Sequence, residues 1–131
     1  MISNLQAAKN YLAALEKGAD REVLAAMLSP DLAYEAFPHR FEPKGAQHDF
    51  EGYLQSIERA RELFARQRYA LRNTMASGDT IALEIDWSGT LATASGNLAA
   101  GTGLRASCAL FLDFRGGRIV RQRNYHCFLP Q

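Results

Sequence analysis

The chain has few of the features that mark secreted, membrane-spanning or nucleic-acid-binding proteins. Its 131 residues include two cysteines, Cys108 and Cys127, so no disulfide framework is expected and both are interpreted as free thiols in a reducing compartment. No apolar run approaches the ~18 residues that span a bilayer, and the first residues lack the continuous apolar core of a signal peptide. Fifteen basic and fourteen acidic residues leave a net charge of +1, which argues against nucleic-acid or membrane partners. The sequence therefore predicts a cytoplasmic protein.

Patterns that bind metals or phosphates are also missing. The histidines His39, His48 and His126 have no ligand spacing, and no Cys-x-x-Cys motif occurs. The glycine-rich stretch SGNLAAGTG (95–103) leads into a predicted strand and contains no lysine, unlike a phosphate-binding loop, which leads into a helix. No metal site and no organic cofactor are predicted.

What is present fits one α+β domain over residues 1–131, with 47% apolar and 22% charged residues. Ser3 begins a capping box for a helix that ends at Gly18, and Asp20 caps a second, short helix that ends at residues 29–31. Residues 32–38 alternate as a strand and 39–49 are irregular. Asp49 caps a third helix, about residues 50–66, with one apolar stripe.

The second half of the chain changes to a period of two. Strands are predicted at 68–77, 80–92, 104–114 and 118–129, with tight turns at 77–79 and 115–117. In the second of these strands Ile81, Leu83, Ile85 and Trp87 share one face. The element order predicts helices gathered on one face of a curved sheet.

This order, with the stretches SGDTIALEIDWSGTL, ASCALFLDF, RGGRIV and QRNYHCFLP, resembles the nuclear transport factor 2-like superfamily, and more closely its SnoaL-like polyketide cyclase group. The resemblance implies a cone-shaped α+β barrel, with three N-terminal helices packed on a strongly curved antiparallel sheet and an apolar pocket at one end. It also implies homodimers through the outer sheet face. In this group an Asp often stands one or two residues after a tyrosine of the last strand, where this chain has His126 and Cys127 after Tyr125.

The strand phase decides what His126 can do. Neighbouring side chains on a strand point to opposite faces, so His126 and Cys127 cannot pair with each other. Burying Arg121 and Arg123 without partners is costly, which places them on the convex face with Tyr125 and Cys127. Val120, Gln122, Asn124, His126 and Phe128 are then the inward set. We expect His126 to be a catalytic acid or base and Asn124 to donate a hydrogen bond to a developing oxyanion.

Further residues are predicted to line the pocket, and each has a plainer structural interpretation. Trp87 either floors the pocket or packs in the core, and His39 lies near the mouth or in a solvated loop. If the strand at 80–92 had the reverse phase, Asp86 would be an inward carboxylate and the best base in the chain. The predicted lining residues are Trp87, Gln122, Tyr34, Phe37, His39, Tyr53 and Phe128.

Two classes of function remain open at the level of sequence. The first is a small-molecule pocket protein that is a cofactor-independent cyclase, isomerase or dehydratase, acting on a small hydrophobic substrate by acid–base chemistry. The second is a ligand-binding or dimerisation module without the catalytic carboxylate. The polar inward set favours a pocket, whereas the residues after Tyr125 favour the absence of catalysis.

Overall fold

The helices begin at the caps that the sequence predicts. The computed structural model describes residues 2–131. Helix α1 (Asn4–Glu16) starts where the Ser3 hydroxyl accepts a hydrogen bond from the Gln6 amide at 3.1 Å. Helix α2 (Arg21–Ala25) follows Asp20, and α3 (Phe50–Leu63) starts where the Asp49 carboxylate accepts from the Gly52 amide at 2.8 Å.

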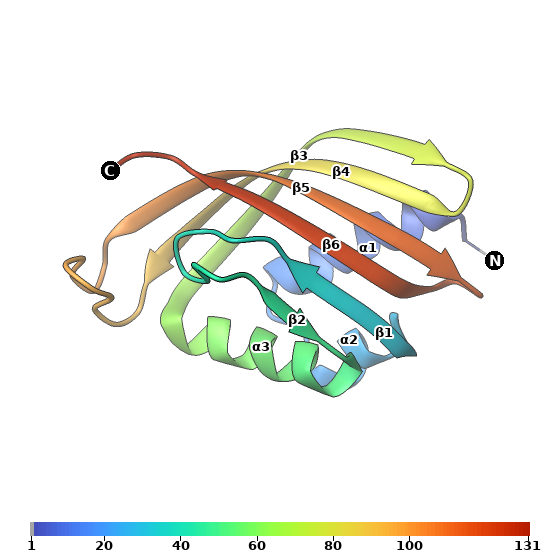
Figure 1. Ribbon diagram of the computed structural model, residues 1–131, viewed down its shortest axis with the longest axis horizontal. Coiled ribbons are helices and arrows are strands. Elements are labelled where there is room, and N and C mark those ends of the chain that lie inside the picture. The colour runs from blue at the N-terminus through green and yellow to red at the C-terminus, as the bar shows by residue number, and fades with distance from the viewer. Residues whose placement is uncertain (1) are drawn as a thin grey trace.

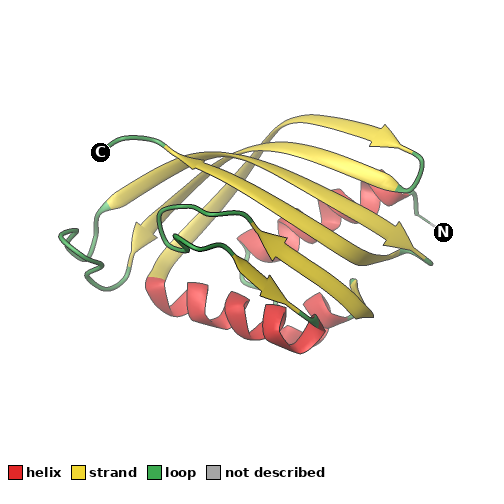
Figure 2. Ribbon diagram, in the orientation of Figure 1, coloured by secondary structure: helices red, strands yellow, loops and turns green. Residues whose placement is uncertain are grey.

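Six strands form one curved, unclosed sheet in the order β2-β1-β6-β5-β4-β3 (Figures 1 and 2). The strands from β3 to β6 form the predicted antiparallel meander, while β1 pairs with β6 in parallel. The strands are β1 (Leu28–Ala36), β2 (Ala46–His48), β3 (Phe64–Ser77), β4 (Thr80–Leu91), β5 (Gly103–Arg115) and β6 (Arg118–Phe128).

Three features of the predicted fold differ in the structure. The sheet is no closed barrel, because β2 and β3 stand at its two ends, and it is not wholly antiparallel, because of the β1–β6 pair. The helices are not all N-terminal, since α3 follows β1 and β2. The α+β class itself, with three helices against a curved sheet, is confirmed.

Several element boundaries also differ from the prediction. Residues 29–31, expected to end the second helix, belong to β1, where the pairing with β6 is irregular between Leu28 and Ala33. This irregular stretch tolerates Pro30, which has no N–H for a ladder. The third helix ends at Leu63, because Phe64 instead pairs with Leu91 and starts β3. The expected irregular segment 39–49 contains the short strand β2.

The core lies between the concave face of the sheet and the helices α1 and α3. Ile81, Leu83, Ile85 and Trp87 of β4 are buried as the period of two predicts, and Asp86 between them is exposed. The same cluster includes side chains of both helices, which lie against one face of the sheet (Figure 2). None of the helices within residues 2–131 is long and apolar enough to cross a membrane.

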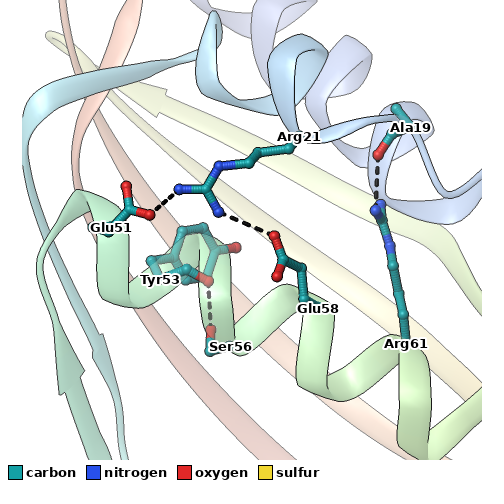
Figure 3. A network of polar contacts seen from close by, with 7 residues as sticks. All are labelled: Ala19, Arg21, Glu51, Tyr53, Ser56, Glu58 and Arg61. Atoms are coloured by element: carbon teal, nitrogen blue, oxygen red, sulfur yellow. Dashed lines mark hydrogen bonds and ion pairs between the residues drawn. The ribbon is translucent and has the colours of Figure 1, made fainter.

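Polar contacts hold α3 against the first two helices (Figure 3). Arg21 of α2 donates hydrogen bonds to Glu51 and Glu58 of α3, the latter at 3.0 Å. Arg61, in the last turn of α3, donates to the carbonyl oxygen of Ala19 at 2.8 Å (Figure 3). These contacts fix the position of α3, which carries Tyr53 into the interior.

Candidate functional site

A cavity of about 280 Å³ opens between the concave face of the sheet, α3 and the loop at residues 37–45. Its wall combines apolar side chains with a few polar groups, which is typical of small-molecule sites. Among the predicted site residues, the wall includes His126, Asn124, Gln122, Phe128, Trp87, Tyr34, Tyr53 and His39.

The last strand points alternate side chains at this cavity. Gln122 and Asn124 are buried and His126 is partly buried, whereas Arg121, Tyr125 and Cys127 are exposed. The set that was predicted to face inward differs at its start, because a bulge opposite Asp113 and Phe114 shifts the phase there. Ile119 is therefore buried at this point of β6. Val120, which was predicted to face inward, is only partly buried.

Burial governs the chemistry of His126. Burial is the main cause that lowers the pKa of His126 to about 4, and electrostatic repulsion from the nearby His39 adds to it. The ring is therefore neutral at pH 7. The two imidazole rings lie with their centroids 4.6 Å apart. The Nδ1 atom of His126 is buried and has no hydrogen-bond partner among the described residues. This imidazole is thus a neutral group whose ring is oriented by packing rather than by a carboxylate.

His39 stands at the same wall in a defined tautomer. Its Nδ1 accepts a hydrogen bond from the backbone N–H of Phe41 at 3.2 Å. Burial lowers its pKa, and the charge of Glu42 partly opposes that effect. When neutral, His39 must therefore carry its proton on Nε2.

A chain of hydrogen bonds connects five polar side chains behind the wall. The Tyr11 hydroxyl contacts the Tyr53 hydroxyl and donates to Oε1 of Gln122 at 2.8 Å. Nε2 of Gln122 donates to Oδ1 of Asn124 at 2.9 Å, and Nδ2 of Asn124 donates to the Tyr34 hydroxyl at 3.2 Å. Burial is the largest factor that raises the pKa of each of these three tyrosines, so all three are neutral.

Two polar residues of this site, Tyr11 and Cys108, are among those that sequence reasoning missed. Tyr11 is fully buried and belongs to the inner face of α1, on which the apolar pattern placed Ala8 and Leu12. Cys108 lines the cavity and lies directly opposite His126 in the β5–β6 ladder. The alternation of Leu104, Ala106, Cys108, Leu110 and Leu112 along β5, all of which are buried, was the available signal.

Trp87 packs in the core and also forms part of the cavity wall, so the two interpretations of this residue are compatible. Its ring meets Phe64 and Phe128 edge-on, with centroids 5.1 and 5.6 Å away. Its Nε1 donates to Oε1 of Gln67 at 3.1 Å. The ring covers Gly89 so closely that a Cβ there would lie 2.6 Å from the indole.

Two side chains face away from the cavity. Phe37 was predicted to line the pocket, but its ring stacks on Tyr125 of the opposite, convex face, with centroids 4.4 Å apart. The residue before it, Ala36, is the one that faces the cavity. Asp86 is exposed and pairs with Arg72 at 3.6 Å, so it is not the inward carboxylate of the reversed phase. Within residues 2–131 no three His, Cys, Asp or Glu residues gather in a way that could hold a metal ion.

The protein is thus an α+β protein in which a curved, unclosed sheet and its helices enclose a mixed apolar–polar cavity. The sequence matches the family model of the SnoaL-like domain over residues 8–122, and the protein belongs to this family. A comparison with curated proteins found no match.

Solved structures share the fold at low sequence identity. IdmH from Streptomyces antibioticus, a candidate polyketide cyclase, is 21% identical with a TM-score of 0.81, over 95% of this chain and 92% of IdmH. AclR from Streptomyces galilaeus, a candidate hydroxylase, is 16% identical with a TM-score of 0.80, over 97% of this chain and 80% of AclR. A protein of ketosteroid isomerase-like fold from Catenulispora acidiphila, in complex with trimethylamine, is 18% identical with a TM-score of 0.75, over 92% and 85%.

Proposed function

We propose that this SnoaL-like protein binds a small hydrophobic molecule in the cavity and acts on it by acid–base chemistry without a cofactor, as a cyclase, isomerase or dehydratase. The observation that carries the proposal is the neutral imidazole of His126 in the cavity wall, two residues from Asn124 on the same face of β6. A neutral imidazole accepts a proton, and the polar groups beside it stabilise the negative charge that the transfer leaves behind.

The proposed step is removal of a proton from carbon next to a carbonyl. The C–H bond breaks, an N–H bond forms on His126, and the electron pair moves onto the carbonyl oxygen as an enolate. Because the pKa of His126 is lowered to about 4, the imidazole is a weak base. It suits a carbon whose C–H is already acidified by two carbonyls. Return of the proton from His126 to another carbon of the ligand completes an isomerisation. In a cyclisation the enolate carbon forms a bond to a second carbonyl carbon, whose oxygen takes the electron pair of the broken π bond and then the proton from His126.

Hydrogen–deuterium exchange tests this step directly. NMR would follow exchange at the central carbon of pentane-2,4-dione and its 3-alkyl derivatives, which are largely un-ionised near pH 7, in D2O at that pH. We expect the wild type to accelerate exchange and His126→Gln to lose at least about tenfold of the acceleration. Cys127→Ser, the adjacent substitution on the convex face, is the matched control and should keep the wild-type rate. If the wild type exchanges these diones no faster than buffer does, the catalytic proposal is wrong.

A ligand-binding module without catalysis is the second candidate. Glu42 is the one carboxylate in the described cavity wall and it is exposed, so no buried carboxylate base faces the cavity. Quenching of Trp87, the one tryptophan of the chain, reports binding independently of turnover. Binding of the diones without accelerated exchange would support this candidate.

We also propose a homodimer through the convex sheet face. Phe37, Phe111 and Tyr125 gather there, and Tyr125 is 39% exposed. Arg123 lies over the Phe111 ring, 5.5 Å from its centroid, and pairs with Asp113 at 2.9 Å. An aromatic cluster with satisfied charges at its edge is typical of protein interfaces. The free thiols of Cys108 and Cys127 support a cytoplasmic location.

A further inference from the structure

We propose that the Tyr34 hydroxyl is the hydrogen-bond donor to a carbonyl or enolate oxygen of the ligand, and that the chain Tyr53–Tyr11–Gln122–Asn124 behind it orients its proton. The proposal rests on the proposed function, since it requires an oxygen-bearing ligand in the cavity. It replaces Asn124 as the direct donor and gives Asn124 a positioning role.

The direction of the hydrogen-bond chain follows from the number of protons on its first two hydroxyl groups. A tyrosine hydroxyl has one proton to donate. Tyr11 uses its proton for Oε1 of Gln122, at 2.8 Å. The contact between the Tyr11 and Tyr53 hydroxyls must therefore use the proton of Tyr53. The first two bonds thus run from Tyr53 to Tyr11 to Gln122.

The amide groups continue in the same direction. Nε2 of Gln122 donates one proton to Oδ1 of Asn124 at 2.9 Å and the other back to the Tyr53 hydroxyl at 3.4 Å. Because Oδ1 of Asn124 accepts, the Asn124 amide nitrogen is left to donate onward. That nitrogen donates to the oxygen of Tyr34 at 3.2 Å. The Tyr34 hydroxyl thus accepts one bond, and its own proton has no acceptor within residues 2–131. The chain ends on a free O–H group in the cavity wall.

Four hydrogen bonds aligned in one direction strengthen the final donor. Each bond polarises the next in a low-dielectric interior, so a hydroxyl that accepts from such a chain becomes a better donor. Burial raises the pKa of Tyr34 well above its usual value, which keeps the proton on its oxygen. Stacking fixes the ring, with centroids 4.3 Å from Tyr53 and 5.8 Å from His48. The donor is therefore preorganised, as stabilisation of a developing charge requires.

The register of the sheet places this donor relative to the proposed base. Tyr34 is opposite Gln122, and Ala36 is opposite Asn124, in the β1–β6 pair. His126 lies two residues beyond Asn124 on the same face, roughly 7 Å along the strand. The small Ala36 side chain leaves space at the intervening position. A ligand whose oxygen binds Tyr34 would thus have its adjacent carbons directed toward His126. A ketone or a dicarbonyl compound has its acidic C–H at those adjacent carbons and so fits this site.

The test compares an enolate with a ligand of similar shape that has no oxygen. Binding of cyclohexane-1,3-dione, as its enolate, and of cyclohexane is measured by Trp87 fluorescence in the wild type, Tyr34→Phe, Tyr11→Phe and Tyr125→Phe. We expect Tyr34→Phe to weaken enolate binding at least about tenfold and cyclohexane binding less than about twofold. Tyr11→Phe, which interrupts the chain upstream, should give a smaller selective loss. Tyr125→Phe, on the convex face, should match the wild type.

The apparent pKa of the bound dione gives a readout that a purely structural role would not move. We expect binding to the wild type to lower the apparent pKa of the dione. The pKa of the dione bound to Tyr34→Phe should lie closer to that of the free dione. In the wild type itself, a downfield hydroxyl proton resonance should appear with the enolate and not with cyclohexane, which keeps the test valid if a variant does not fold.

The outcomes separate this inference from the function on which it rests. If Tyr34→Phe weakens both ligands equally, or if no such resonance appears, Tyr34 is not the donor although the cavity still binds small molecules. If the wild type binds neither ligand, the proposed function and this inference both fail.

Discussion

At residue 126 the surroundings of the imidazole, rather than a charged partner, determine its protonation. Its ring is partly buried between His39 and Phe128, and its Nδ1 has no hydrogen-bond partner in the described part of the chain. A carboxylate at this position would be charged at neutral pH and would need donors to remain buried. A neutral imidazole avoids that penalty. Its protonation would place a charge in the interior, so the stability of the fold becomes sensitive to acid.

We predict that His126 makes the folded protein less stable between pH 6.5 and pH 4. Its pKa is lowered from 6.5 to about 4 in the folded state, so the unfolded chain takes up a proton first as the pH falls. The free energy of unfolding should therefore decrease through this window, by up to about 3 kcal/mol for this group, and be unaffected above it. Urea unfolding at pH 7.5 and pH 4.5 measures the loss.

His126→Gln provides the comparison for this prediction. It removes the titrating group, so its loss of stability between the two pH values should be smaller than that of the wild type. Some loss should persist, because the pKa of His39 is lowered as well. An equal loss in both proteins would show that His126 titrates normally in the fold.

At the scale of elements, the sequence predicts what is periodic and local. The alternation in β4 places Ile81, Ile85 and Trp87 inward, and the caps at Ser3 and Asp49 start two helices as expected. The three-residue strand β2 is too short for any period to reveal. The parallel pairing of β1 with β6 has no local signal, because it joins segments from opposite ends of the described chain.

The candidate site was predictable to a similar degree. The cost of burying two arginines places Gln122, Asn124 and His126 inward, and the structure has them in the cavity wall. Phe37 directly follows the end of β1 and is three residues from Tyr34. Residues three apart on extended backbone do not share a face, and Phe37 is the one turned outward. The hydrogen-bond chain through Tyr11 depends on α1 and β6 meeting in space, which no spacing along the sequence encodes.

The loop at residues 37–45 gives a prediction about access to the cavity. Phe41 packs edge-on against Phe64 and Phe128, with centroids 5.6 and 5.2 Å away. Phe41→Ala should loosen this loop and expose Cys108, which lines the cavity and is 6% exposed. We expect alkylation of Cys108 by iodoacetamide, followed by peptide mass spectrometry, to become several-fold faster.

Cys127 is an internal reference in the same experiment. It is exposed on the other face of the sheet and should react at one rate in both proteins. Burial raises the pKa of the Cys108 thiol to about 12, so in the wild type Cys108 should react far more slowly than Cys127. If Phe41→Ala leaves the Cys108 rate unchanged, the loop does not control entry.

At the scale of the whole molecule, the proposed dimer should depend on the convex face and not on the cavity. We predict a dimer by light scattering for the wild type and a monomer for Tyr125→Glu, because a buried, unpaired carboxylate would oppose association. Tyr125→Phe keeps the ring and should remain dimeric. Ligand should still quench the Trp87 fluorescence of the Tyr125→Glu monomer. A monomeric wild type would contradict the proposed dimer.

The parallel pairing of β1 with β6 has a consequence for the order of folding. The bonds that complete the site join Tyr11 to Gln122, 111 residues apart, and Tyr34 to Asn124, 90 residues apart. Contacts of such separation form late, since a large loop must close first. Until β6 meets β1 and α1, the helices and the meander can form, but the phenol groups of the interior lack their amide partners. Binding competence should therefore emerge in the last kinetic phase, after most of the secondary structure has formed.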